Sequence, residues 1–287
     1  MSHIMSPSSP DLDAPAAERD RNDDPPASGK PGPAQAHPRV AIPIDLEQSA
    51  ILLDIDGTLL DIAPTPHEVY VSAELRTVLS RLARRLGGAL GLISGRSLAD
   101  IDYIFDPLQL PAVGGHGAEI RPAANAEICR MQVPPIDPQL KRRFAEIGQL
   151  DPGIIVEDKE YSIAIHYRLA QEFGGAVIKS VAAICDKYGG DGLSILPGKS
   201  VIEIKPRGFD KGSGLQQLMS LSPFAGRTPI FVGDDITDEA AFAMLPRFSG
   251  IGVSVGGIVP GASFNFDGPQ DVRLWLQNLS NVTREAG

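Results

Sequence analysis

Two aspartates lie two residues apart directly after a short apolar run, in the segment Asp54-Ile55-Asp56-Gly57-Thr58-Leu59. Carboxylates at positions i and i+2 of an extended segment point the same way, and they repel one another unless a cation or a proton is shared. Mg²⁺ prefers carboxylate and carbonyl oxygens, so the pair predicts a magnesium site. The glycine and threonine add a tight turn, a hydroxyl and backbone N–H groups that can face a phosphate. A turn that merely ends a strand also uses Asp and Gly, but the whole segment favours chemistry.

Three further segments carry groups that suit a phosphate and a metal. Ser94-Gly95-Arg96 follows the apolar run of residues 89–93, where a hydroxyl and a helix N-terminus can bind phosphate oxygens. Lys211 begins a predicted helix, and its charge opposes the helix dipole unless an anion is bound. Asp234 and Asp235 follow the apolar run of residues 230–232, and bare neighbouring carboxylates there indicate a metal. Taken singly, the Ser94–Arg96 segment would be explained equally well as a helix cap, and Lys211 as a solvated surface lysine.

The elements that position these residues follow from apolar periodicity. Short apolar runs alternate with stretches of helical spacing, which predicts a parallel sheet with helices on both faces. The runs are residues 51–53, 89–93, 111–113, 230–232 and 251–255. Ser72, Ser97 and Thr237 are the predicted helix N-caps, and Asp238 and Glu239 then suit a first helical turn. Ligands of an open parallel sheet bind beyond the carboxyl ends of its strands, which is where the polar segments fall.

The middle of the chain breaks this alternation. A helix beginning at Asp137-Pro138 precedes strands near 154–157 and 161–167, a helix over 172–188, and strands near 193–196 and 200–205 joined by Pro-Gly. This αββαββ order predicts a small antiparallel sheet with helices on one face. We expect residues 122–206 to be a domain inserted between two core parts, 46–121 and 207–287. Residues 1–45, rich in Pro, Ala, Ser and Asp, are predicted to be a disordered tail.

Composition excludes several classes of partner and location. The net charge of −10 over 287 residues argues against nucleic acid, although a local metal and cations still allow an anionic substrate. The sequence has no apolar run of the roughly 18 residues that a membrane span requires, and its first twenty residues do not resemble a secretory signal. Cys129 and Cys185 are the only cysteines, too few for a disulfide framework. We therefore expect a cytoplasmic protein that acts on a small molecule.

The four polar segments, in this order, resemble the haloacid dehalogenase superfamily of phosphatases over about residues 50–260. The resemblance implies an α/β fold with a Rossmann-like, doubly wound parallel core and an inserted α+β cap domain. It implies that Asp54 is the nucleophile and forms an aspartyl-phosphate, and that Asp56 is the general acid and base. Ser94 and Lys211 would bind the phosphate. The implied Mg²⁺ ligands are Asp54, the backbone carbonyl of Asp56 and Asp234, with Asp235 or Asp238 assisting directly or through water.

Within that superfamily the middle of the chain resembles trehalose-6-phosphate phosphatases. The resemblance rests on the segments Glu157-Asp158-Lys159, Ile165–Arg168 and Gly198–Pro206, together with Gly114–Glu119 and Gly233–Glu239. It implies that Glu157, Lys159 and Glu203 hydrogen-bond sugar hydroxyls in a site that excludes water. Taken alone, Glu157 and Lys159 could be exposed charges that flank a hairpin turn, and Glu203 could be a strand residue that faces solvent. His116, Gly95 and Arg96 are expected beside the substrate; Arg96 could instead pair with an active-site acid, and His166 could be structural.

The expected activity is hydrolysis of trehalose 6-phosphate to trehalose and phosphate, in trehalose biosynthesis, coupled to a synthase on a separate chain. One alternative is a related phosphatase that acts on another sugar phosphate, such as sucrose 6-phosphate or mannosyl-3-phosphoglycerate. The other is a catalytically silent protein that senses trehalose phosphate or scaffolds a synthase. The Glu157–Lys159 segment argues against the first, and the complete set of Asp54, Asp56, Lys211 and Asp234 argues against the second.

Overall fold

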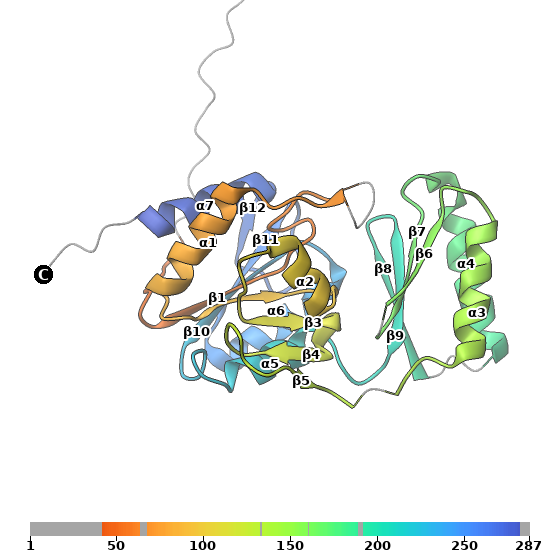
Figure 1. Cartoon of the computed structure of the whole chain (residues 1–287). Helices are drawn as coiled ribbons and strands as arrows, with labels where there is room; N and C mark the ends of the chain where they lie inside the picture. The colour runs from red at the N-terminus through yellow and green to blue at the C-terminus, as the bar shows by residue number, and fades with distance from the viewer. Residues whose placement is uncertain (1–41, 64–67, 133, 160, 189–191, 282–287) are drawn as a thin grey trace, which may run out of the picture. The chain divides into compact units, whose positions relative to one another are not determined.

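A computed structural model describes residues 42–63, 68–132, 134–159, 161–188 and 192–281. Most of the predicted tail, residues 1–41, lies outside the described residues. Ile42, at the start of the described chain, is buried and belongs to the main hydrophobic core. The described residues form two β-sheets, one of eight strands and one of four (Figure 1).

In the larger sheet, the first strand of the chain lies between two strands that are far apart in the sequence. Its order is β12-β11-β10-β1-β2-β3-β4-β5. The strands are β1 (Ser49–Leu53), β2 (Leu90–Ile93), β3 (Ala112–Gly114), β4 (Glu119–Arg121), β5 (Cys129–Arg130), β10 (Thr228–Gly233), β11 (Ile251–Val255) and β12 (Phe264–Phe266). Pairing from β12 to β3 is parallel, and β4 and β5 add an antiparallel edge. Every residue of β1 and β2 is buried, as expected of a parallel sheet covered on both faces.

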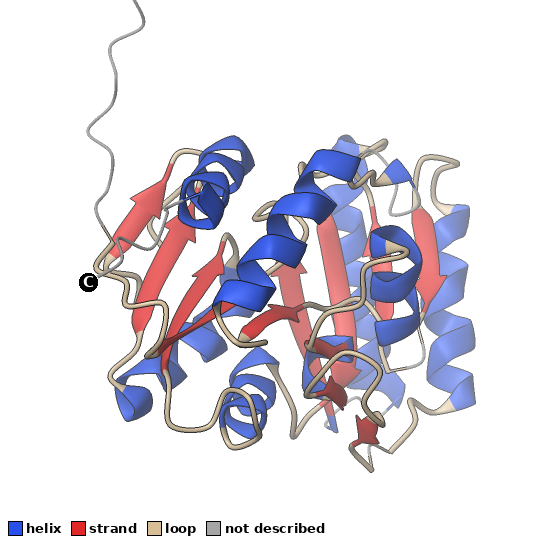
Figure 2. Cartoon of the chain, turned by 60° about the vertical axis from the view of Figure 1, so that its left-hand side comes forward, coloured by secondary structure: helices blue, strands red, loops and turns tan. Residues whose placement is uncertain are grey.

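Helices cover both faces of this sheet, which confirms the doubly wound core. They are α1 (Ala73–Arg85), α2 (Leu98–Phe105), α5 (Lys211–Met219), α6 (Glu239–Met244) and α7 (Pro269–Asn281). Helices α1 and α7 lie together on one face, and α5 and α6 lie together on the other (Figures 1 and 2). The predicted caps of α1 and α2 are present, because the Ser72 and Ser97 side chains accept hydrogen bonds from Leu75 N and Asp100 N. Among the described residues no helix has the length and apolar character to cross a membrane.

The four-stranded sheet and its two helices, which we call the cap, have the predicted αββαββ order. They are α3 (Pro138–Glu146), β6 (Ile155–Asp158), β7 (Ile163–His166), α4 (Gly174–Tyr188), β8 (Leu193–Gly198) and β9 (Val201–Pro206). The sheet order is β6-β7-β9-β8, and all of its pairs are antiparallel. Helices α3 and α4 lie side by side on one face (Figure 1).

The predicted Pro-Gly turn of the cap is wrong by two residues. Pro197 and Gly198 belong to β8 and pair with Ile202 and Val201 of β9. The turn is made by Lys199 and Ser200, and Ser200 adopts a left-handed backbone with φ of 62°. The antiparallel register decides the position of the turn, and this register depends on pairing that local turn preferences do not specify.

Each sheet has its own hydrophobic core. The larger cluster of buried residues draws on residues 42–120 and 215–276, and the smaller one draws on residues 136–204. These two clusters support the proposed division into core parts 46–121 and 207–287 with an inserted domain at 122–206. The boundaries themselves remain a proposal.

Candidate active site

Three neighbouring strands of the larger sheet end in polar residues at the same edge. Asp54 follows β1, Ser94 follows β2 and Asp234 follows β10. The strands pair in parallel, and Asp54 N continues the ladder by donating to Val232 O at 2.9 Å. Polar side chains therefore converge beyond the carboxyl ends of the strands, the usual ligand position of an open α/β sheet.

A single cavity, partly open to solvent, is lined by all the predicted site residues except Asp238. The empty space between its lining residues, open solvent included, is about 1090 Å³. The residues predicted from the sequence that line it are Asp54, Asp56, Ser94, Gly95, Arg96, His116, Glu157, Lys159, Glu203, Lys211, Asp234 and Asp235. The core and the cap both contribute, so the structure brings the predicted phosphate-binding and sugar-binding groups into one space.

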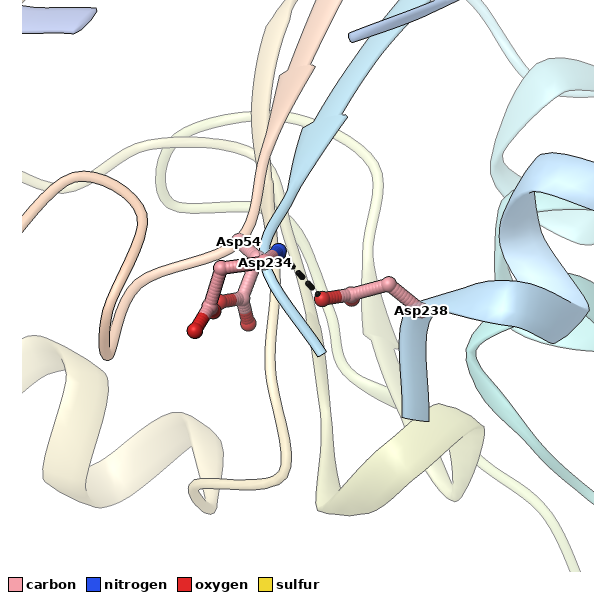
Figure 3. A group of neighbouring side chains, drawn as sticks. All are labelled: Asp54, Asp234 and Asp238. Atoms are coloured by element: carbon pink, nitrogen blue, oxygen red, sulfur yellow. Dashed lines mark hydrogen bonds between the residues drawn. The ribbon is translucent and has the colours of Figure 1, made fainter. Parts of the chain in front are cut away.

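Three buried aspartates form the most acidic part of this site (Figure 3). Asp54, Asp234 and Asp238 each offer a carboxylate oxygen within 4.8 Å of the others. Asp238 Oδ2 accepts hydrogen bonds from the backbone N–H groups of Asp234 at 2.9 Å and Asp235 at 3.2 Å. Asp238 thereby holds the loop that carries Asp234. From the residues alone Asp238 suited a first helical turn, and the family resemblance offered it, as the alternative to Asp235, as an assisting metal ligand; in the structure its carboxylate is fully buried.

Lys211 is the ammonium group of the same cluster. Its Nζ donates to Asp54 Oδ1 and to Asp238 Oδ1, each at 2.7 Å, and all three side chains are buried. Burial alone would lower the pKa of Lys211, but the two carboxylates outweigh it and raise this pKa well above its ordinary value. The lysine therefore remains charged and fixes the orientation of Asp54.

The carboxylates nevertheless retain excess negative charge. Burial, opposed by the Lys211 charge, raises the pKa of Asp54 to about 7. Burial together with the nearby Asp54 raises the pKa of Asp234 to about 6. Two lysines, Lys211 and Lys199 of the cap, face three buried acids, and a divalent cation would relieve the remaining repulsion. Oxygen donors at these positions suit Mg²⁺.

The close contact between Asp234 and the Asp54–Leu59 segment explains Gly57. Gly57 has a φ of +90°, and a Cβ there would lie 2.3 Å from Asp234 Oδ2. Thr58 Oγ1 also donates to Asp234 Oδ1 at 3.1 Å. A glycine is therefore needed both for the backbone angle and for the space beside the carboxylate.

Asp235 and Thr237 differ from the sequence interpretation. The predicted N-cap Thr237 is wrong, because Asp235 caps the short helix η6 (Ile236–Asp238). Asp235 Oδ1 accepts from Thr237 N at 2.8 Å and from Thr237 Oγ1 at 2.7 Å. The extended backbone of Asp235 makes it the cap, and spacing alone could not choose between two capping residues that lie two positions apart. The metal-binding role predicted for Asp235 stays a prediction.

Arg96 pairs with an acid in this structure. Its Nε and Nη2 bind Asp56 Oδ2 and Oδ1 at 2.6 and 2.8 Å, in a bidentate ion pair. Burial alone would lower the pKa of Arg96, but the hydrogen bond and charge of Asp56 raise it. Of the two expectations for Arg96, the contact with Asp56 is the one observed.

On the cap side of the cavity, three polar groups lie close to the Glu203 carboxylate. Glu203 Oε2 lies 2.6 Å from His116 Nε2, and Oε1 lies 2.5 Å from Ser162 Oγ and 3.5 Å from Lys159 Nζ. Burial alone would raise the pKa of Glu203, but the charges of His116 and Lys159 outweigh it, and this pKa lies well below its usual range. His116 comes from the core turn η2 (Gly115–Gly117), so this ion pair joins core and cap.

Glu157 and His166 form a second pair in the cap. His166 Nε2 lies 3.1 Å from Glu157 Oε2. Burial alone would raise the pKa of Glu157, but His166 and Lys159 lower it. His166, whose role the sequence left open, lines the cavity beside the predicted sugar-binding acids.

Two cap cations were not singled out from the sequence. Lys199 Nζ reaches down from the β8–β9 turn to Asp234 Oδ2 at 2.6 Å. The Arg168 guanidinium donates to the carbonyl oxygens of Ala63 and Lys199, and both cations line the cavity. Their segments had been quoted for the family resemblance, but neither residue had been given a role.

The arrangement therefore has two chemically different ends. The core end carries a buried aspartate oriented by a lysine, a serine hydroxyl and a cluster of carboxylates that could hold a divalent cation. The cap end carries buried carboxylates with ammonium and imidazole groups, which can satisfy the many donors and acceptors of a polyol. A phosphate ester of a polar, neutral molecule fits this combination.

Comparison with known proteins agrees with this chemistry. The family model described as trehalose-phosphatase matches residues 52–262. The trehalose-6-phosphate phosphatase of Escherichia coli is 36% identical over 241 residues, covering 82% of this chain and 88% of that protein. A bifunctional trehalose-6-phosphate synthase/phosphatase of Thermoproteus tenax is 35% identical, and the match covers 80% of this chain and 31% of that longer protein.

Solved structures share the fold. The Candida albicans trehalose-6-phosphate phosphatase C-terminal domain has a TM-score of 0.75 and 21% identity, covering 83% of this chain and 93% of that one. BT1666 of Bacteroides thetaiotaomicron, a phosphatase of the haloalkanoate (HAD) enzyme superfamily, has a TM-score of 0.54 and 18% identity, covering 87% and 100%. The predicted superfamily fold is thus confirmed, and the matches in sequence identify the chain as a phosphatase that belongs to the trehalose-phosphatase family.

Proposed function

We propose that the protein hydrolyses trehalose 6-phosphate to trehalose and phosphate, as a step of trehalose biosynthesis. The single observation that carries the proposal is the shared cavity, in which the Asp54–Lys211 pair of the core faces Glu157, Lys159 and Glu203 of the cap. The family membership of the chain supports the same substrate.

In the proposed reaction Asp54 attacks phosphorus. An Asp54 Oδ–P bond forms, the bond from phosphorus to the sugar oxygen breaks, and Asp56 gives its proton to that oxygen. Asp56 then removes a proton from water, which attacks phosphorus and releases phosphate and free Asp54. Ser94 and Lys211 balance charge on the transferring group. In the structure Arg96 holds Asp56 in a bidentate ion pair, so this pair must open before Asp56 can give its proton to the sugar oxygen.

We propose Mg²⁺ as the cofactor. The proposed ligands are Asp54, the backbone carbonyl of Asp56, and Asp234, with Asp235 or Asp238 assisting. The raised pKa values of Asp54 and Asp234 support a cation there, because burial and the neighbouring acids disfavour the charged carboxylates more than their lysine partners favour them. When bound, Mg²⁺ would neutralise phosphate oxygens and lower the barrier to attack by an anionic carboxylate.

We also propose that a trehalose-6-phosphate synthase supplies the substrate and that both act in the cytoplasm. The bifunctional relative, which carries synthase and phosphatase in one chain, supports such coupling. The low cysteine count supports a reducing compartment.

Phosphate release from a panel of sugar phosphates in the presence of Mg²⁺ tests the proposal. The panel comprises trehalose 6-phosphate, sucrose 6-phosphate and mannosyl-3-phosphoglycerate. We expect a strong preference for trehalose 6-phosphate, abolition of turnover by Asp54→Asn with the fold retained, and reversible loss in EDTA. Preference for another sugar phosphate would overturn the substrate. Absence of turnover would favour a silent sensor, and metal-independent turnover would remove Mg²⁺ from the proposal.

A further inference from the structure

Glu119 is a buried carboxylate next to the cavity but not among the residues that line it. It lies on β4 and is 3% exposed, and both oxygens of its carboxylate accept hydrogen bonds. Among the described residues that line the cavity, neither Glu119 nor its side-chain partners Arg130 and Tyr161 appears. Its function therefore cannot be direct contact with the substrate.

One oxygen of Glu119 holds the start of helix α2. Glu119 Oε2 accepts the backbone N–H of Leu98, the first residue of α2, at 2.8 Å. A carboxylate is favourable there because the first N–H groups of a helix lack partners and carry partial positive charge. Ser97 alone separates Leu98 from the Ser94–Arg96 segment. Glu119 thus fixes the end of the loop that faces the phosphate.

The other oxygen of Glu119 reaches the cap. Glu119 Oε1 accepts Arg130 Nε at 3.2 Å and the Tyr161 hydroxyl at 3.5 Å, and the Arg130 guanidinium also hydrogen-bonds Tyr161. Glu119 and Arg130 are direct cross-strand partners of β4 and β5. The core therefore presents a paired acid and base to one cap tyrosine.

Tyr161 belongs to the hairpin tip that carries the proposed sugar-binding lysine. The hairpin is closed by the bond from Lys159 N to Ser162 O at 2.9 Å, and both Lys159 and Ser162 turn their side chains to Glu203. The Tyr161 ring lies directly over Gly115 of the core, where a Cβ would approach its Cδ2 to 2.8 Å. Tyr161 is thus the point at which this tip rests on the core.

We infer that Glu119 is a positioning residue that links the phosphate-binding loop of the core to the sugar-binding hairpin of the cap through Tyr161. The inference rests on the proposed function for its kinetic readout. Glu119 acts on the loop through Leu98 and on the hairpin through the hydroxyl of Tyr161. Loss of the hydroxyl should affect sugar recognition alone, whereas loss of the carboxylate should affect both ends of the site.

Kinetics with two substrates separate these effects. We expect Tyr161→Phe to lower kcat/KM for trehalose 6-phosphate about 10-fold, mainly through KM, with p-nitrophenyl phosphate unchanged. Glu119→Gln should lower kcat/KM for both substrates, and the loss for trehalose 6-phosphate should be about 10-fold larger than the loss for p-nitrophenyl phosphate. In the double variant the preference for the sugar phosphate should fall about 10-fold, not about 100-fold, because the two side chains act in series. The exposed Glu127→Gln is the matched control and should change neither value.

Amide exchange provides a readout that needs no substrate. Exchange of the Lys159 amide should be faster in both Tyr161→Phe and Glu119→Gln than in the wild type and in Glu127→Gln. Additive kinetic losses, or unchanged exchange and unchanged substrate preference, would overturn the inference. If the wild type prefers another sugar phosphate, the proposed function fails, and that substrate replaces trehalose 6-phosphate in the same comparison. Should Glu119→Gln fail to fold, Tyr161→Phe still decides the hairpin contact.

Discussion

Replacement of Lys211 by methionine tests the electrostatic reasoning most directly. The variant keeps a long unbranched side chain but leaves Asp54 and Asp238 buried without their shared ammonium. Removing one partner of a buried ion pair costs about 3–5 kcal/mol of unfolding free energy. For a domain of this size that corresponds to a fall in melting temperature of about 10 °C. The exposed Lys179→Met on α4 is the matched control and should stay within about 0.5 kcal/mol of wild type.

The pH dependence of that loss separates an electrostatic cause from a packing defect. Without Lys211 the folded-state pKa values of Asp54 and Asp238 rise further above the unfolded value of about 3.9. The folded variant then binds more protons than the unfolded chain, so its stability falls as pH rises, by about 1.4 kcal/mol per pH unit per extra proton. Thermal unfolding without metal should show a larger deficit at pH 8 than at pH 5. A deficit independent of pH, or larger at pH 5, would refute the reasoning.

Three other perturbations test different parts of the site. The gain in melting temperature from Mg²⁺ should be larger at pH 8 than at pH 5.5, because Asp54 and Asp234, with pKa values of about 7 and 6, must lose protons to bind it; an equal gain at both values would contradict this. Gly57→Ala should cut phosphate release about 100-fold by displacing Asp234, whereas Gly208→Ala, which has a φ of +105° and open space, should retain activity. Glu203→Gln should lower kcat/KM for trehalose 6-phosphate at least about 10-fold but leave kcat/KM for p-nitrophenyl phosphate within about 2-fold of wild type. The exposed Glu172→Gln is the control for this variant. Equal losses on both substrates would exclude a role of Glu203 in sugar recognition.

The parts of the fold that depend on local pattern were predictable from the sequence. Five apolar runs identified parallel strands, and Ser72 and Ser97 marked the starts of α1 and α2. Burial of a strand on both faces requires a continuous apolar run, and a cap requires a side-chain oxygen that accepts a hydrogen bond at one position, so few neighbouring residues suffice for either prediction.

The contacts that depend on long-range pairing could not be predicted from the sequence. Lys199 meets Asp234 across 35 residues of sequence, and Lys211 meets Asp238 across 27. The register of β8 with β9 directs the first contact, and the packing of α5 beside η6 directs the second. No local spacing specifies either. Local spacing therefore gave Asp238 only a helix-dipole explanation, and the family resemblance alone suggested a place beside the metal, whereas in the structure its carboxylate holds both the lysine and the loop of Asp234.

The order of strands in the larger sheet has a consequence for synthesis of the protein. Ile51 of β1 pairs with Leu90 on one side and with Ile230 on the other. When the first half of the chain has been made, β1 is an open sheet edge, and its partner strand is still to be translated. The cap has its own hydrophobic cluster from residues 136–204 and can complete its contacts first. We expect an interval during translation in which a folded cap accompanies an unfinished core, and in which the exposed edge of β1 is the site most open to chaperone binding or aggregation.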